Sequence, residues 1–379
     1  MLGKKFLFYL LGAAILLAVA YGVVHDRLAY RYQAYEKSEV MLDTLVTIRA
    51  YGDDQQGVEA AVAAALAAMR EVGRETDYFD PKSEISVANR KAARGGRASV
   101  HSDLANLLSL ASAYYRDTGG AFDVTIGPVA RLYDFDKKRV PSPAKLREKL
   151  LLVDGSRLDI PRQRDPRLLT PADTAKLRFA LRVGPGQLLD LGGVAKGYAA
   201  DIGTRVLEER GIASAIVTTG STTVILGEHP TNPLGRYVPA LFGAGDRSWT
   251  IGVQHPRRPL GRLAGKIITG PGSVSTSGDY QQTFVKDGVR YHHILDPKTG
   301  LPARGFTSVT VLTRRSCAAA DILSTALFVM GPANAKRWLA RNEDVQAVLI
   351  DSKGRVFVTA GLREGTSARV AGLPSELTF

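Results

Sequence analysis

Cysteine is almost absent from this sequence. Cys317 is the only one among 379 residues, so no internal disulfide can form and no CxxC pair is available to hold zinc or an iron–sulfur cluster. Cys317 precedes an alanine-rich stretch, where we expect a small buried side chain. Histidine is scarce too: six are present, and two of them are the adjacent His292 and His293.

Long runs of one charge are also missing. The net charge is +13, yet the basic residues are scattered among acidic ones. A nucleic-acid-binding protein would need a basic stripe with interleaved aromatic residues, and because there is none we expect no nucleic-acid partner. A basic surface of this kind suits an anionic membrane or a phosphorylated ligand.

One long apolar run is present, at residues 6–24 (FLFYLLGAAILLAVAYGVV). About 20 apolar residues span a bilayer, and Lys4 and Lys5 in the 1–5 segment favour a cytoplasmic start. Ala18-Val19-Ala20 offers a cleavage site, but the apolar run continues past it. We therefore expect one uncleaved transmembrane helix in the inner membrane, with a cleaved signal as the alternative and the rest of the chain on the periplasmic side in both cases. No cysteine stands directly after the run, which excludes a lipoprotein anchor.

After this run we expect a polar tether at 25–40, a folded domain at 41–365 and a C-terminal tail at 366–379. Strands in hairpins mixed with helices predict an α+β fold with mixed or antiparallel sheets and packed helices. The expected helices are 56–76, 102–120, 194–211 and 316–331, with another after Pro332. The expected strands are 41–52, 177–181, 186–192, 214–220, 222–227, 249–254 and 266–270, with hairpins at 284–295 and 348–359 and an irregular insertion at 229–247.

The stretch AADILSTALFVMG (319–331) places Asp321 and Thr325 four residues apart, on one face of an otherwise apolar helix. A buried carboxylate is costly without a partner. Carboxylate and hydroxyl oxygens are ligands that Mg²⁺ prefers, and backbone amides of a neighbouring loop would also satisfy the aspartate. Both readings are open on these residues alone.

The stretch LLDLGGVAKGY (188–198) runs from an apolar segment into Gly192-Gly193 and then a helix that begins near Lys196. Glycines let the backbone approach a ligand, and a helix N-terminus favours anions. Neither a Walker A spacing nor GxGxxG is present. The motif indicates an anion-binding turn or, alternatively, a tight turn with a solvent-exposed lysine.

Three more segments place polar groups in turns. TSGDY (276–280) carries Asp279, and TGGAFDVTIGP (118–128) carries an aromatic and a carboxylate after a helix end. In HHILDPKTGLP (292–302), adjacent strand residues face opposite sides, so at most one of the two histidines points into a given pocket.

These five motifs, in this order, resemble the FAD:protein FMN transferase (ApbE) family from about Met41 to about residue 360. The resemblance implies an ApbE-like fold and a Mg²⁺-dependent transferase that splits FAD as its substrate. Such an enzyme moves FMN onto a threonine hydroxyl of a partner protein and releases AMP. The implied partner is a subunit of a membrane redox complex.

The resemblance also assigns roles by position. Asp321 and Thr325 would hold Mg²⁺ with a backbone carbonyl near Gly193. His293 would be the base or proton relay for the incoming threonine, and Asp279 would polarise or position it. The residues expected to contact FAD are Met41, Tyr78, Ala121, Phe122, Asp123, Asp190, Lys196 and Leu295.

Two segments depart from the family pattern. Thr218 and Gly220-Ser221-Thr222 stand where family members have an asparagine and Gly-Gly-Asp, and a Met-Gly-Thr start reads Met41-Leu42-Asp43-Thr44. Loss of an amide and a carboxylate would weaken contacts to the flavin or the acceptor. Two other functions stay open: a Mg²⁺-dependent FAD pyrophosphatase giving FMN and AMP, and a membrane-anchored FAD-binding protein without chemistry.

Overall fold

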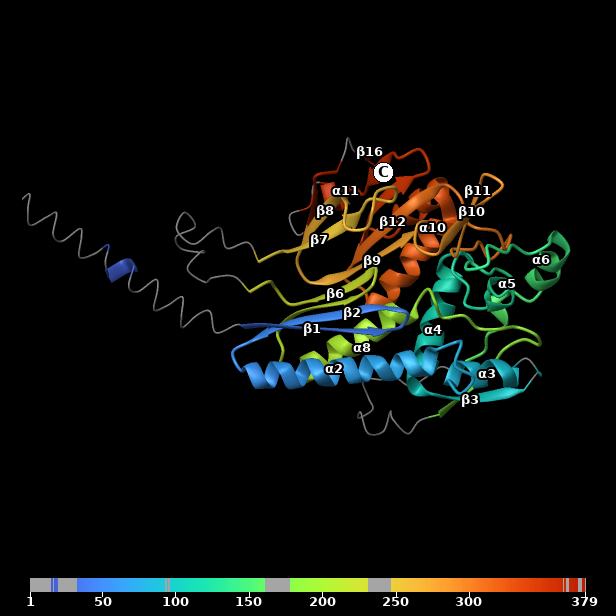
Figure 1. The fold of residues 1–379 in the computed structure, drawn as a ribbon, viewed down its shortest axis with the longest axis horizontal. Coiled ribbons are helices and arrows are strands. Elements are labelled where there is room, and N and C mark those ends of the chain that lie inside the picture. The colour runs from blue at the N-terminus through green and yellow to red at the C-terminus, as the bar shows by residue number, and fades with distance from the viewer. Residues whose placement is uncertain are drawn as a thin grey trace, which may run out of the picture.

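The computed structural model describes residues 15, 17–19, 33–92, 94, 96–160, 178–230, 247–363, 365, 368–373, 377 and 378. Its main element is a nine-stranded sheet in the order β1-β2-β5-β6-β9-β12-β13-β14-β16 (Figure 1). Neighbouring strands are antiparallel, except β14 and β16, which are parallel. The strands are β1 (Gln33–Met41), β2 (Thr44–Gly52), β5 (Ser214–Thr219), β6 (Thr222–Leu226), β9 (Gly272–Gly278), β12 (Phe306–Thr313), β13 (Val345–Asp351), β14 (Val356–Val358) and β16 (Leu377–Thr378).

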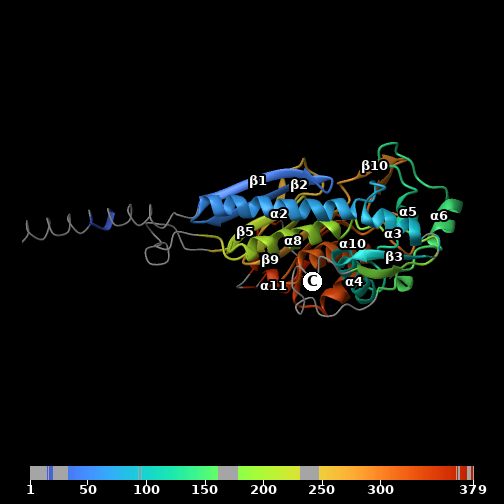
Figure 2. The ribbon, with the colours of Figure 1, turned by 90° about the horizontal axis from the view of Figure 1, so that it is seen from below.

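Three long helices pack against this sheet, as the two views show (Figures 1 and 2). They are α2 (Gln55–Thr76), α8 (Ala195–Glu209) and α10 (Cys317–Leu339). Val58, Val62, Leu66 and Met69 of α2 are buried at helical spacing, which fixes the face that packs towards the core. The predicted helices at 56–76, 194–211 and 316–331 are confirmed.

A smaller sheet in the order β15-β8-β7 covers the opposite face of the large one. It contains β7 (Trp249–Gln254), β8 (Leu263–Thr269) and β15 (Ala368–Ala371). In β13, Ala347 and Leu349 belong to the cluster around α10, while Val348 and Ile350 pack with the small sheet. Because successive side chains alternate between faces, this continuous apolar run is buried on both sides.

Short elements complete the described fold. Strands β3 (Arg97–His101) and β4 (Arg178–Arg182) form one ribbon, and β10 (Thr283–Lys286) and β11 (Val289–His292) form another. Asp287 and Gly288, both with positive φ, join β10 to β11, which confirms the predicted hairpin. The remaining elements are α3 (Glu84–Ala92), α4 (Ser102–Asp117), α5 (Gly127–Ala130), α6 (Pro143–Leu150), the 3₁₀ turn η1 (Gly155–Arg157) and α11 (Ala360–Arg363).

The tether predicted at 25–40 is wrong for residues 33–40, which form β1. The strand QAYEKSEVM has few apolar residues, so it shows no hydrophobic alternation. It is an edge strand held by its register with β2, where Glu36 pairs with Arg49. A two-residue turn, Leu42-Asp43, with φ of 55° at both positions, sets that register.

The strand predicted at 186–192 is also wrong. Among the described residues, this segment makes one isolated bridge, between Leu188 and Ile126, and forms no strand. Its backbone groups bond elsewhere: Leu189 exchanges two hydrogen bonds with the Asn89 side chain, and the Asp190 amide donates to Val124. An amide side chain therefore replaces a neighbouring strand.

The apolar run at 6–24 and the insertion at 229–247 lie almost entirely outside the described residues. Positions 15 and 17–19 are helical. Within the part of the chain that the structure describes, α10 is long and apolar enough to cross a membrane, but 67% of its most apolar window is buried inside the fold. It is the core helix of this domain.

Candidate functional site

A cavity of about 1930 Å³ lies where the ends of many segments meet. It collects residues that are far apart in sequence, from the β1–β2 turn to α10. All of the predicted site residues except Asp279 line it: Met41, Tyr78, Ala121, Phe122, Asp123, Asp190, Gly193, Lys196, His293, Leu295, Asp321 and Thr325.

Asp321 and Thr325 lie on the first half of α10, which begins after Ser316, whose hydroxyl accepts from the Ala319 amide. The Asp321 carboxylate is only 5% exposed, and its Oδ2 accepts from the Gly197 amide at 3.0 Å. A Cβ at position 197 would lie 2.5 Å from the Cys317 carbonyl oxygen. Glycine there lets α8 cross α10 closely enough to make this bond.

Hydroxyl groups fill the other side of the aspartate. Thr222 Oγ1 and Ser275 Oγ each lie 3.4 Å from Asp321 Oδ1 and 2.9 Å from one another. Ser277 Oγ lies 3.1 Å from Thr325 Oγ1 and 2.8 Å from Ser324 Oγ. Among the described residues, no lysine, arginine or histidine forms an ion pair with Asp321.

The backbone of Gly193, which has no side chain, lies close to Thr325. A Cβ at this position would lie 3.6 Å from Thr325 Oγ1 and 3.0 Å from Phe122 Cε2. Carboxylate, hydroxyl and main-chain oxygens are the donors that Mg²⁺ takes, and a buried carboxylate without a cationic neighbour calls for a cation. Asp321, Thr325 and the main chain near Gly193 therefore fit a magnesium ion.

The loop before α8 is held by its own polar groups. The Gly192 amide donates to Asp190 Oδ1 at 2.8 Å, and Lys196 Nζ donates to the Gly192 carbonyl at 3.0 Å. The turn thus presents the N-terminus of a 15-residue helix, with a lysine beside it, to the cavity.

The two histidines face opposite ways, as the strand alternation predicts. His292 is buried, its Nε2 lies 3.0 Å from the Ala303 carbonyl oxygen, and its ring contacts Phe328. His293 lines the cavity, and its Nδ1 has no hydrogen-bond partner among the described residues. Burial, together with the positive charge of Lys196, lowers the pKa of His293 to about 4, so its imidazole is neutral at physiological pH.

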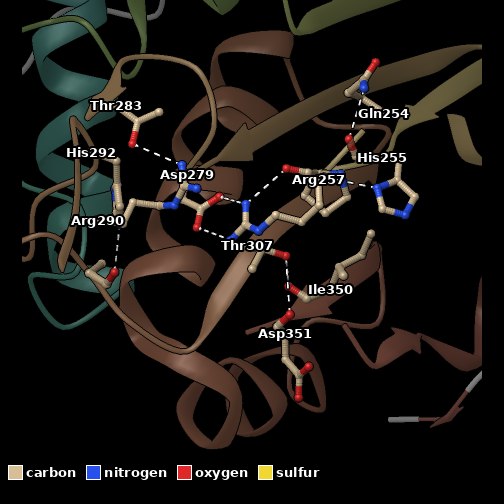
Figure 3. Close-up of polar contacts among 12 residues, drawn as sticks. Gln254, His255, Arg257, Asp279, Thr283, Arg290, His292, Thr307, Ile350 and Asp351 are labelled. Atoms are coloured by element: carbon tan, nitrogen blue, oxygen red, sulfur yellow. Dashed lines mark hydrogen bonds and ion pairs between the residues drawn. The ribbon is translucent and has the colours of Figure 1, made fainter. Parts of the chain in front are cut away.

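Asp279 does not take the position predicted for it. Its two carboxylate oxygens accept from Nη1 and Nη2 of Arg257 at 2.6 and 2.7 Å (Figure 3). It lies just beyond β9 and outside the cavity lining, and it makes no hydrogen bond to His293. The sequence placed Asp279 in a polar turn, but it could not show that an arginine more than twenty residues earlier would occupy both oxygens.

The residues expected to contact the nucleotide have different surroundings. Arg131 stacks its guanidinium 4.1 Å from the centre of the Tyr78 ring, while the buried Tyr78 hydroxyl has no partner among the described residues. Asp123 accepts from the amide and hydroxyl of Thr125 and from the Gly155 amide. Its carboxylate thus holds the loop together, and burial raises its pKa.

Several functional candidates were missed from the sequence, above all the hydroxyls of Thr222, Ser275 and Ser277. The alternation in GSVSTSG, the sequence of β9, places Ser275 and Ser277 on one face of the strand. That alternation can be read from the sequence. The proximity of Thr222 cannot be read from it, because it depends on the pairing of β6 with β9.

A second cluster of potential ligands, Glu75, Glu84 and His101, has its oxygen and nitrogen atoms within 4.8 Å of one another. It already contains a cation: Arg178 lies 3.3 Å from Glu84 Oε1 and 3.0 Å from His101 Nε2. Burial and neighbouring carboxylates raise the pKa of Glu75 to about 7. This cluster is separate from the predicted metal ligands.

The ApbE family model matches residues 42–349. The chain belongs to the ApbE family. A relative from Treponema pallidum (strain Nichols), named FAD:protein FMN transferase, is 31% identical over 339 residues, 88% of each chain. A relative of the same name from Klebsiella pneumoniae (strain 342) is 27% identical over 87% of this chain and 93% of its own. The crystal structure of an ApbE protein from Thermotoga maritima superposes with a TM-score of 0.70 at 29% identity, covering 86% of this chain and 96% of its own.

The segment that departs from the ApbE pattern lies at the β5–β6 turn, beside the cavity. Gly220 has a φ of 64°, and a Cβ there would lie 2.5 Å from Thr44 Oγ1. Thr218 Oγ1 lies 3.3 Å from Thr223 Oγ1, while Thr222 turns towards Asp321. In this ApbE protein, a hydroxyl therefore stands beside the central aspartate, at the position where the resemblance led us to expect a carboxylate.

Proposed function

We propose that this protein is an FAD:protein FMN transferase that uses Mg²⁺ to move FMN from FAD onto a threonine hydroxyl of an acceptor protein. The observation that carries the proposal is the meeting of Asp321, Thr325 and the Gly193 backbone in the cavity that His293 lines. The two relatives reported above carry this activity in their names. The predicted roles of the FAD-contacting residues are part of the proposal.

His293 acts on the acceptor. Its low pKa keeps a ring nitrogen free to accept the proton of the threonine hydroxyl. The threonine oxygen forms a bond to the phosphorus that carries FMN, and the bond from that phosphorus to the bridging oxygen breaks. AMP leaves with the bridging oxygen, and the proton stays on the histidine.

The cavity supplies charge and orientation for this step. Phosphoryl transfer depends on positioning and charge neutralisation more than on covalent chemistry from the enzyme. Asp321, Thr325 and the main chain near Gly193 would hold Mg²⁺, which when bound neutralises the pyrophosphate oxygens. Lys196 and the N-terminus of α8 add positive potential, and the stacked pair of Tyr78 and Arg131 lines the same cavity.

The N-terminal run supports a location for this reaction. Residues 6–24 are uncharged and long enough to cross a bilayer. We place the folded domain on the periplasmic side of the inner membrane, where a subunit of a membrane redox complex would be its acceptor. Alkaline extraction of cell membranes tests the anchor: an anchored protein stays in the pellet, and one whose signal is cleaved is released.

The acceptor assay tests the function. The purified full-length chain is incubated with FAD, Mg²⁺ and a threonine-bearing periplasmic domain of a redox-complex subunit. We expect a covalently fluorescent acceptor and one AMP for each FMN transferred. FMN and AMP without labelled acceptor would indicate a pyrophosphatase, and intact bound FAD would indicate a carrier.

A further inference from the structure

The loop between β7 and β8, residues 255–262 (HPRRPLGR), forms one side of the cavity. Gln254, at its start, donates from Nε2 to the carbonyls of His255 and Pro259 and accepts from the Gly261 amide. The His255 amide also bonds to the Arg262 carbonyl. These contacts give the loop a defined shape within its own hairpin.

Arg257 joins this shaped loop to the large sheet. Its guanidinium makes the two-pronged contact with Asp279, and Nη1 also donates to the Pro256 carbonyl at 3.0 Å. Asp279 is 6% exposed and is fixed at the end of β9, where its amide donates to the Thr307 carbonyl. Paired, charge-assisted bonds of this kind set orientation as well as distance.

The residues that follow Arg257 face the cavity. Arg258 and Leu260 both line it. Leu260 is 94% exposed, so a large apolar side chain stands uncovered at the wall of a cavity that also holds Asp321 and His293. The two adjacent arginines thus have different surroundings: Arg257 bonds to Asp279 at the end of β9, and Arg258 lines the cavity.

We propose that Arg257 and Asp279 are a positioning pair that holds residues 255–262 in place, so that Arg258 and Leu260 contact bound FAD. The inference rests on the proposed function for the identity of the ligand. It gives the aspartate of the TSGDY motif a role in substrate affinity, in place of the role beside His293 that the sequence suggested. Removal of the pair leaves the fold and the metal ligands intact but releases the loop, and FAD binds more weakly.

The test compares two double variants of the full-length protein. In Arg257→Gln/Asp279→Asn both charges of the pair are neutralised, so no buried carboxylate is left without a partner. The matched control is Arg355→Gln/Asp351→Asn, because Arg355 and Asp351 form a similar pair at 2.7 Å, with 53% and 3% side-chain exposure, outside the cavity lining. FAD affinity is measured by calorimetric titration with Mg²⁺ and without acceptor, while AMP release is followed in parallel.

For the 257/279 variant we expect about a tenfold rise in the Kd for FAD, with a higher KM for FAD and a nearly unchanged kcat. Trypsin should cleave after Arg262, at the end of the loop, several-fold faster than in the wild type, and saturating FAD should no longer slow it. The control pair should leave the Kd unchanged. The reversed pair Arg257→Asp/Asp279→Arg should recover part of the affinity.

An FAD Kd within twofold of wild type, or a control pair that weakens FAD equally, would overturn the inference. A rise in the acceptor KM alone would also overturn it, and would assign the loop to acceptor docking instead. If the wild type binds FAD but transfers no FMN, the proposed function fails, while the effect of the pair on FAD affinity is still measured.

Discussion

Asp321 and Glu84 are both nearly buried carboxylates, but their neighbours differ in kind. Glu84 Oε1 bonds to His101 Nδ1 at 2.9 Å and to Arg178 at 3.3 Å, so its charge is balanced within the protein. Asp321, within the described residues, has the Gly197 amide and two hydroxyls as neighbours and no cation. Amides and hydroxyls orient a carboxylate without cancelling its charge.

The histidines of the two clusters repeat the contrast. His101 has a carboxylate on one ring nitrogen and Arg178 beside the other. Among the residues that the structure describes, His293 Nδ1 has no hydrogen-bond partner, and this histidine lines the cavity. One cluster already contains a cation, Arg178, whereas the other faces a cavity and has none among the described residues. Potential ligands therefore indicate a metal site when no cationic side chain already balances the charge of their carboxylates.

The largest effect should come from Asp321→Asn. The variant keeps the shape of the side chain but loses the charge that holds the metal, and the several kcal/mol that a metal supplies corresponds to a fall of about 10³-fold in FMN transfer. The rate is measured as fluorescent acceptor formed per minute. Glu84→Gln is the control and should transfer at near wild-type rate; a comparable loss in it would remove the distinction between the clusters.

His293→Ala should lower the rate of FMN transfer by about 10²-fold or more, as expected for loss of a general base, while His101→Ala should not.

The pH dependence of the wild-type reaction also tests the role of His293. Because the base works when unprotonated and its pKa in the free enzyme is about 4, kcat/KM should be level from neutral pH down to about pH 5 and fall below that. A fall that begins near pH 6.5, where a free histidine titrates, would contradict the assignment.

Thr222→Val tests the hydroxyls behind Asp321. Loss of a group that orients a metal ligand typically costs 10- to 100-fold in metal affinity, and the long 3.4 Å contact places the expected loss near the lower end. The Mg²⁺ concentration at half-maximal rate reports it. Thr310→Val removes a buried hydroxyl that pairs with Thr276 instead, and it should leave that concentration unchanged.

The smallest effect should come from Glu75→Gln, which acts on stability. The carboxyl titrates near 4.5 when unfolded and near 7 in the fold, so the folded state binds more protons in this window. The free energy of unfolding therefore falls as pH rises from 4.5 to 7. Solvent screening at this partly exposed site limits the penalty to about 1 kcal/mol. Urea unfolding at pH 8 should show the variant more stable by that amount, with no difference at pH 4. Glu148→Gln, at an exposed residue paired with Lys149, is the control and should show no such gain.

The sequence predicted those parts of the fold in which local chemistry decides the structure. The spacing of Val58, Val62 and Leu66 predicted α2, and Asp287-Gly288 predicted a hairpin. Strand β1 was missed because its stability comes from pairing with β2 and not from its own apolar residues. The motif residues that share the cavity were predicted through the family resemblance rather than through their spacing alone.

The rest of the site depends on contacts between segments far apart in sequence. The 186–192 segment was taken for a strand because no local pattern shows that Asn89 satisfies its backbone. The family resemblance assigned Asp279 to His293, and no sequence pattern shows that its partner is Arg257, which lies in a loop with no motif of its own. Long-range polar pairs of this kind leave no periodic signal in the sequence.

The most direct test of the account is a titration with Mn²⁺, an oxygen-seeking substitute for Mg²⁺, followed by electron paramagnetic resonance in the full-length wild type, Asp321→Asn and Glu84→Gln. The account predicts one tightly bound Mn²⁺ in the wild type and in Glu84→Gln, and its loss in Asp321→Asn. Retention of the ion in Asp321→Asn, or its loss in Glu84→Gln, would contradict the claim that Asp321 holds the metal.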